Sequence, residues 1–105
     1  PQSAHEGKGE AVSPTDLVAT ALGTCVRTVM GITARRKGWG IEGAAVEVEK
    51  IMTIEGPRSI KALKLRISMP PELSDDQVKL LQRVVDTCPV KQSLEEAIAM
   101  EFSWS

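Results

Sequence analysis

Cysteine and histidine are scarce in this sequence of 105 residues, which contains two cysteines and one histidine, His5. Two cysteines are too few for the disulfide framework of a small secreted scaffold. They do not form a CxxC motif, and one histidine leaves a single chain without the four ligands of a zinc site. His5 lies outside any patterned segment, so we expect it to be a surface residue and not a general base.

Excess charge of one sign and long apolar runs are lacking as well. The 13 basic and 14 acidic residues give a net charge of -1, which offers no electrostatic case for binding nucleic acid or an anionic membrane. The longest apolar runs fall short of the ~20 residues that span a bilayer, and no signal-peptide pattern is visible. We therefore expect a soluble, cytoplasmic protein with neither nucleic acid nor a membrane as its partner.

The composition that remains is that of an ordinary globular protein, 42% hydrophobic and 26% charged, and the length favours a single domain. Residues 1–12 are polar, contain glycine and have little pattern. We interpret them as a loop or as the remnant of an N-terminal region, with further residues expected before Pro1. Residues 13–105 form the predicted domain.

Residues 13–37 are predicted to form a long helix. Ser13 is its expected N-cap, and Asp16 stands at the acidic position of a capping box. Gly23 and Gly31 each cost ~1 kcal/mol relative to alanine inside a helix, which suggests close approach of another backbone or a ligand. An apolar stripe at helical spacing is predicted to face the core; it comprises Val18, Ala21, Leu22, Cys25, Val29 and Ile32.

Alternating apolar residues predict three strands. Residues 44–55 and 63–69 alternate on either side of an "EGPRS" turn and indicate a hairpin, in which Lys50 interrupts the apolar face of the first strand. Residues 98–104 alternate in the same way and predict a final strand.

Two shorter helices are predicted between the hairpin and the final strand. Ser74 and Gln77 form a capping box at the start of the first of them. Pro89 disfavours helical geometry for Cys88 and suits the first position of the next helix. If Cys88 caps that helix, unpaired backbone N–H groups and the positive dipole end are expected to lower the pKa of its thiol.

The order of elements predicts an α+β fold, with amphipathic helices covering one face of an antiparallel or mixed sheet. Three strands leave two open edges, which are sites of unwanted pairing. We expect N-terminal strands, a partner chain or both to cover them.

The two cysteines, Cys25 and Cys88, admit two interpretations. Free cysteine behaves as a small buried hydrophobe, and both residues lie on apolar stripes. Alternatively they form a functional thiol pair. A bond between them would close a loop of about sixty residues and stabilise the fold by about 4 kcal/mol, but a reducing cytosol favours a transient bond formed during turnover.

The stretches "SPTDLVATALGTC" and "TCPV", together with the order of elements, resemble the OsmC/Ohr family of proteins that reduce organic hydroperoxides. The resemblance covers nearly the whole chain from Ser13 onward. It implies that Cys25 is the peroxidatic thiolate, which becomes a sulfenic acid, and that Cys88 is the resolving thiol, which condenses with it to a disulfide. It also implies an external dithiol reductant, in the Ohr branch a lipoylated protein, and no metal, flavin or heme.

The resemblance further implies an intertwined homodimer with its active sites at the subunit interface. Leu22 and Val26 would then contribute to a pocket for alkyl or lipid hydroperoxides, with plain core packing as the alternative. Ohr-type enzymes carry a glutamate ten residues before the first cysteine, whereas this chain has Thr15 there, followed by Asp16. The family's activating arginine belongs to an N-terminal part that would precede this sequence.

These departures leave two further interpretations open. In the first, the chain is a non-catalytic homodimer that binds small apolar ligands or senses redox state. In the second, both cysteines are inert core residues.

Overall fold

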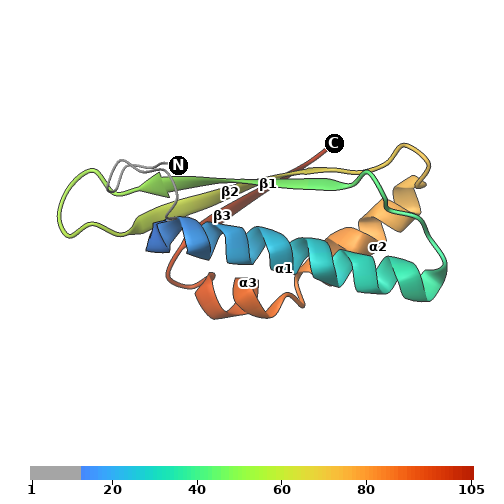
Figure 1. Cartoon of the computed structure of the whole chain (residues 1–105), viewed down its shortest axis with the longest axis horizontal. Coiled ribbons are helices and arrows are strands. Elements are labelled where there is room, and N and C mark those ends of the chain that lie inside the picture. Colours follow the sequence, from blue (N-terminus) through green and yellow to red (C-terminus); the bar gives the residue numbers. More distant parts are fainter. Residues whose placement is uncertain (1–12) are drawn as a thin grey trace.

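A three-stranded sheet covered on one face by three helices makes up the fold (Figure 1). The computed structural model describes residues 13–105, so the interpretation of residues 1–12 as a loop and the expectation for His5 lie outside the described residues. The predicted α+β order of helix, hairpin, two helices and strand is confirmed. The elements are α1 (Pro14–Lys37), β1 (Ala45–Met52), β2 (Ile60–Ser68), α2 (Asp75–Val85), α3 (Pro89–Leu94) and β3 (Ala99–Trp104).

Helix α1 begins and ends where its sequence predicts. The Ser13 hydroxyl accepts a hydrogen bond from the backbone N–H of Asp16 at 3.1 Å, which satisfies one of the free donors of the first turn. Gly38 ends the helix in a left-handed conformation, with φ of +76°, and its N–H reaches back to the Ala34 carbonyl.

The buried face of α1 differs from the predicted stripe. Ile32 is 44% exposed and Ala21 is also exposed, whereas the helix packs through a neighbouring face. Apolar side chains surround most of this helix, so helical spacing alone does not decide which face points inward. The face that is buried consists of Ala19, Leu22, Gly23, Val26, Met30 and Ala34.

The sheet is mixed. β1 pairs with β2 in antiparallel fashion, β2 pairs with β3 in parallel, and β2 is the central strand. The register places two sets of side chains on opposite faces. The helix-facing set comprises Val46, Val48, Lys50, Leu63, Leu65, Ile67, Met100, Phe102 and Trp104, and the outer face carries charged side chains that include the Arg66–Glu47 ion pair at 3.1 Å.

Gly23 lets α1 approach β1 closely. A Cβ atom added to Gly23 would lie 2.8 Å from Cγ2 of Val48, closer than packed carbon atoms come. The close approach expected at this glycine is present, but it is made by a valine side chain of β1 and not by the backbone or ligand that was expected. At Gly31 the nearest group is the flexible guanidinium of Arg27, at 3.2 Å, so no backbone requires a glycine there.

Helices α2 and α3 deliver the second cysteine to the core. The predicted capping box is present at the start of α2, where Gln77 N–H donates to the Ser74 hydroxyl and Ser74 N–H donates to the Gln77 side chain. Leu81 and Val85 are buried, and Cys88 follows them between α2 and α3 with no exposed surface.

Candidate thiol site

The two cysteines meet on the flank of α1 that faces α3. Cys25 projects from the middle of α1, is partly buried and packs against the core. Cys88 is fully buried at the start of α3, and its thiol lies close enough to Cys25 for that residue to raise its pKa. Packing of α1 against α2 and α3 therefore brings together two sulfur atoms that are distant in the sequence.

Cys88 is the N-cap of α3. Its Sγ accepts a hydrogen bond from the backbone N–H of Lys91 at 3.4 Å, and Pro89 occupies the first helical position, as predicted. The expected pKa decrease is wrong. Burial raises the pKa of the Cys88 thiol, the interaction with Cys25 raises it further, and the Lys91 N–H offsets only part of this increase. A helix of six residues offers too little charge stabilisation to outweigh the loss of hydration.

A largely apolar cavity of about 280 Å³ lies between α1 and α3; neither cysteine lines it, although Pro89 directly follows Cys88. From α1 it is lined by Val18 and Ala21, which lie two turns and one turn before Cys25 on the same side of the helix. The α3 side consists of Pro89, Val90, Ser93 and Leu94.

Leu22 and Val26, which the resemblance suggested as pocket residues, are completely buried in the core. Leu22 belongs to the stripe predicted to face the core, and Val26, one turn further along α1, is buried beside it. The structure thus favours the core-packing alternative for these two residues.

Thr15 and Asp16 form a polar cluster with Lys50 at the start of α1. The Lys50 ammonium donates to the Thr15 hydroxyl at 2.8 Å and to the Asp16 carboxylate at 2.6 Å. The hydrogen bond from Lys50, supported by one from Ser13, lowers the pKa of Asp16. Asp16 therefore binds a strand lysine and does not complete the capping box expected from its position.

The role of Lys50 follows from this cluster. Lys50 lies on the helix-facing side of β1, where it interrupts the row of apolar side chains. This position places its charge beside the first turn of α1. A lysine among apolar residues indicates that an acidic side chain lies nearby, but the sequence did not indicate that this residue is Asp16.

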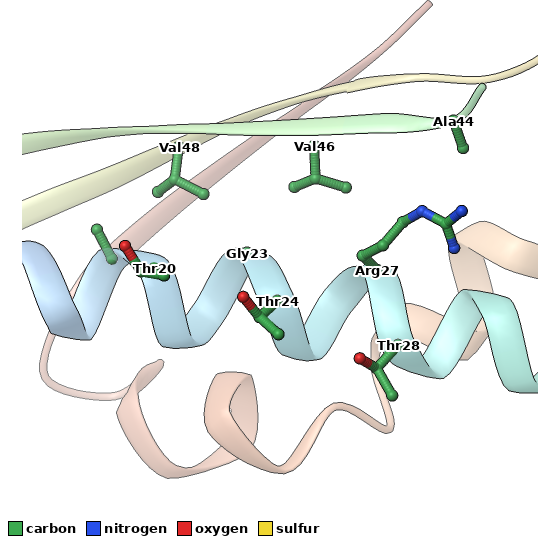
Figure 2. A pocket seen from close by; sticks show the side chains of 9 residues that line it. Thr20, Gly23, Thr24, Arg27, Thr28, Ala44, Val46 and Val48 are labelled. Carbon is green, nitrogen blue, oxygen red and sulfur yellow. The ribbon is translucent and has the colours of Figure 1, made fainter. Parts of the chain in front are cut away.

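A second cavity, of about 420 Å³, lies between α1 and the edge strand β1. In Figure 2, Val46 and Val48 point from β1 toward α1, and Arg27 extends beside Ala44. The Arg27 guanidinium donates to the Ile41 carbonyl at 3.3 Å, so the cation nearest to Cys25 in the sequence of α1 is engaged away from the thiols. The α1 lining consists of Ala19, Thr20, Gly23, Thr24, Arg27 and Thr28.

Lys91 belongs to the thiol site and was not identified from the sequence. Its backbone N–H caps Cys88, while its ammonium contacts Glu95 at 2.7 Å and Asp86 at 3.2 Å. Both carboxylates raise the pKa of Lys91, Glu95 most strongly. Its helical spacing to Glu95 was visible in the sequence, but the contacts with Asp86 and with the sheet were not.

Residues 13–105 were also considered for a metal site and for a membrane-spanning helix. No group of three His, Cys, Asp or Glu side chains that could hold a metal ion is found there. By length and composition α1 would suffice to cross a membrane, with a mean hydropathy of 1.5, but core helices of soluble proteins pass the same test. In this chain α1 packs against the sheet, α2 and α3.

The fold and the paired thiols define an α+β protein with a dithiol between its long and short helices. The sequence profile of the family described as OsmC-like protein matches residues 7–103. The chain therefore belongs to the OsmC family, and the resemblance to OsmC/Ohr proteins is confirmed. A comparison with curated protein sequences gives no match.

Solved structures share this fold. The crystal structure of an osmotic stress induced and detoxification response protein from Psychrobacter arcticus 273-4 is 36% identical, with a TM-score of 0.86, and the match covers 100% of this chain and 76% of that one. The organic hydroperoxide resistance protein OsmC of Legionella pneumophila is 17% identical (TM-score 0.76; 100% and 77% covered). The organic hydroperoxide resistance protein OhrB of Bacillus subtilis is 14% identical (TM-score 0.75; 90% and 71% covered). These last two likenesses concern the fold alone.

Proposed function

We propose that this protein is a thiol-dependent peroxidase that reduces organic hydroperoxides and contributes to peroxide resistance. The observation that supports this most directly is the proximity of Cys25 and the buried Cys88, with an apolar cavity between the two helices that carry them. Family membership and the hydroperoxide resistance named for two proteins of the same fold point to the same chemistry.

Each cysteine has one role in the proposed reaction. The Cys25 thiolate attacks the peroxide oxygen, the O–O bond breaks, and the products are a Cys25 sulfenic acid and, after protonation, an alcohol. The Cys88 thiol then attacks the Cys25 sulfur, which forms the disulfide and releases water. The raised pKa of Cys88 keeps it protonated while Cys25 reacts, so the two roles are consistent with their different environments.

The regenerating step uses an external dithiol. Exchange with a lipoyl-type dithiol carried by a protein, or with another dithiol, returns both cysteines to thiols and leaves the reductant as a disulfide. Neither step requires a metal, flavin or heme. Reduced thiols of this kind persist in the cytoplasm, where we place the protein.

The substrate class follows from the cavity between α1 and α3. Its lining is mainly hydrocarbon, and at about 280 Å³ it accommodates an alkyl or aryl group between the two helices that carry the thiols. Burying that group favours organic hydroperoxides over hydrogen peroxide, which has no apolar surface to bury.

Homodimer formation is part of the proposal. α1 is apolar around most of its circumference, yet Leu17 and Ile32 are 55% and 44% exposed. Large apolar side chains that are exposed together often mark an interaction surface, and β1 and β3 also carry unpaired outer edges among the described strands. A second copy that packs against α1 would cover this surface.

The test uses reduced protein, cumene hydroperoxide and a dithiol reductant, with peroxide loss as the readout. Cys25→Ser is expected to abolish consumption. Cys88→Ser is expected to retain one stoichiometric reaction but to lose turnover and to accumulate over-oxidised Cys25. Serine is a good N-cap, so this variant keeps the cap on α3 and serves as the matched structural control. Unchanged consumption by Cys25→Ser would rule out the proposal.

The alternative is a non-catalytic homodimer that binds small apolar ligands or senses redox state. It is supported by Thr15 in place of the family's glutamate, and by the engagement of Arg27 with the Ile41 carbonyl. Tight binding of cumyl alcohol combined with slow oxidation of Cys25 would favour this function. Fast second-order oxidation of Cys25 would exclude it.

A further inference from the structure

The short helix that follows Cys88 packs against the core through Val90, and Gln92 donates to the Asp86 carbonyl at 2.8 Å. The side chain of Lys91 adds contacts that reach beyond this helix. α3 has six residues, too few to be stable without tertiary contacts. Its third residue, Lys91, has a side chain only 15% exposed, and this side chain contacts groups on both sides of α3 and on the sheet.

The Lys91 ammonium makes three contacts. It pairs with Glu95, the C-cap of α3, at 2.7 Å, and with Asp86, the C-cap of α2, at 3.2 Å. It also lies 6.0 Å from the centre of the Phe102 ring on β3, within the range of a cation–π interaction. The single charge therefore links the end of α2, the end of α3 and the edge strand β3.

Cys88 lies inside this arrangement. Asp86 precedes it by two residues, and the backbone N–H of Lys91 donates to its sulfur at 3.4 Å. Loss of the ammonium contacts would release the first turn of α3, and with it the N-cap geometry that orients the Cys88 sulfur toward Cys25.

We propose that Lys91 is a positioning residue for the resolving thiol. By holding α3 against the end of α2 and against Phe102, it keeps the Cys88 sulfur next to Cys25. In the proposed peroxidase, on which this role in turnover rests, the position of Cys88 decides the fate of the Cys25 sulfenic acid. Condensation with the Cys88 thiol gives the disulfide and water, whereas a second hydroperoxide molecule oxidises it to the sulfinic acid and releases an alcohol.

The first experiment measures the Cys25–Cys88 disulfide without any peroxide. Wild type and variants are equilibrated in dithiothreitol redox buffers, and the oxidised fraction is read by thiol alkylation and mass spectrometry. Lys91→Met keeps the hydrocarbon stem but removes the charge. It is expected to lower the equilibrium constant for disulfide formation about tenfold, a shift of about 30 mV for this two-electron couple.

Three further variants make the measurement specific. Lys91→Arg keeps the charge and is expected to stay within about twofold of wild type. Lys79→Met removes an exposed lysine from α2 and is expected to change nothing. If Lys91→Met does not fold, the double variant Asp86→Asn with Glu95→Gln removes both anionic partners, which are exposed, and is expected to show the same loss.

The second experiment adds excess cumene hydroperoxide and compares Cys25 disulfide with Cys25 sulfinic acid. Lys91→Met is expected to shift the products toward the sulfinic acid, whereas Lys79→Met keeps the wild-type ratio. Wild-type protein that forms the disulfide in redox buffer but does not consume peroxide would refute the proposed function and leave the role of Lys91 standing.

Other outcomes overturn the role of Lys91. They are an unchanged disulfide equilibrium in both the Lys91→Met and the double variant, a loss of equal size in Lys91→Arg, or a wild-type protein that forms no Cys25–Cys88 disulfide in any redox buffer.

Discussion

At the scale of the single residue, the Cys88 sulfur experiences opposing effects. The Lys91 N–H stabilises its thiolate, while burial and the neighbouring Cys25 favour the neutral thiol. Burial is the largest of these effects, so the pKa of Cys88 lies above its ordinary value of 9.0. Helix capping by a cysteine is therefore compatible with a protonated thiol when the sulfur is excluded from water.

This pKa increase predicts a pH dependence of stability. The folded protein retains the Cys88 proton at pH values where the unfolded chain loses it, so the contribution is complete below about pH 9 and declines as pH rises through the folded pKa. Urea unfolding of the reduced protein should show stability falling above pH 9. Cys88→Ala should show a shallower decline over the same range.

The useful window for this comparison ends near pH 10.5, because the pKa of Lys91 is raised above that ordinary value and its own contribution is lost at higher pH. Cys88→Ala also removes the N-cap and is expected to lower stability by about 1 kcal/mol at neutral pH. The test is therefore how steeply stability falls with pH, and not the difference in stability at neutral pH. Equal slopes in the two proteins would contradict the assignment of the raised pKa to Cys88.

At the scale of the element, the sequence predicts where α1 begins and ends but not which face of the helix points into the core. Its Ser13 cap and Gly38 stop are local features, and both were evident from the sequence. Its rotation about its own axis depends on how closely β1 can approach, and Gly23 permits that approach at Val48. This rotation buries Leu22 and Val26 and turns Cys25 toward α3.

The two helix glycines therefore predict opposite effects of alanine. Gly31→Ala is expected to stabilise the protein by up to about 1 kcal/mol, because among the described residues the close neighbour is the end of the flexible Arg27 side chain, at 3.2 Å. Gly23→Ala gains the same helix propensity but forces a methyl group against Val48, and overpacking of this kind costs about 1–3 kcal/mol.

Thermal or urea unfolding of the two variants decides between these outcomes. The double variant Gly23→Ala with Val48→Ala should recover part of the loss, since removal of the Val48 methyl groups relieves the contact. Additive effects of the two substitutions would show that the close approach does not account for the loss.

At the scale of the whole molecule, the sheet and helices of residues 13–105 leave part of α1 uncovered. Leu17 and Ile32 are exposed there. Three threonines of α1 line the cavity between this helix and β1 (Figure 2). Both outer strands of the sheet, β1 and β3, have one unpaired edge among the described residues. These surfaces are the physical argument for the proposed second copy.

The proposed homodimer predicts an effect of charge on this face. Leu17→Glu combined with Ile32→Glu is expected to weaken self-association by at least tenfold, because each buried copy of α1 would then carry unpaired carboxylates. Analytical ultracentrifugation measures the change. Lys79→Glu, at an exposed position of α2, is the control and should leave the dimer intact.

Circular dichroism shows whether the double variant keeps its helices, as expected for two exposed positions. A wild-type protein that is monomeric at micromolar concentration, or a double variant that dimerises like wild type, would argue against α1 as the interface.

The sequence by itself determined the elements and their order, because caps, prolines and alternating strands act over a few residues. Family resemblance, carried by short motifs, singled out Cys25 and Cys88, whose catalytic roles stay a prediction. Only the tertiary structure decided which face of α1 is buried and that the two thiols lie close enough to interact. It also decided that Lys50 binds Asp16, far away in the sequence, and that Lys91 binds Asp86 at the end of α2. These features depend on helix rotation and strand register, which follow from the packing of many side chains at once and leave no local pattern in the chain.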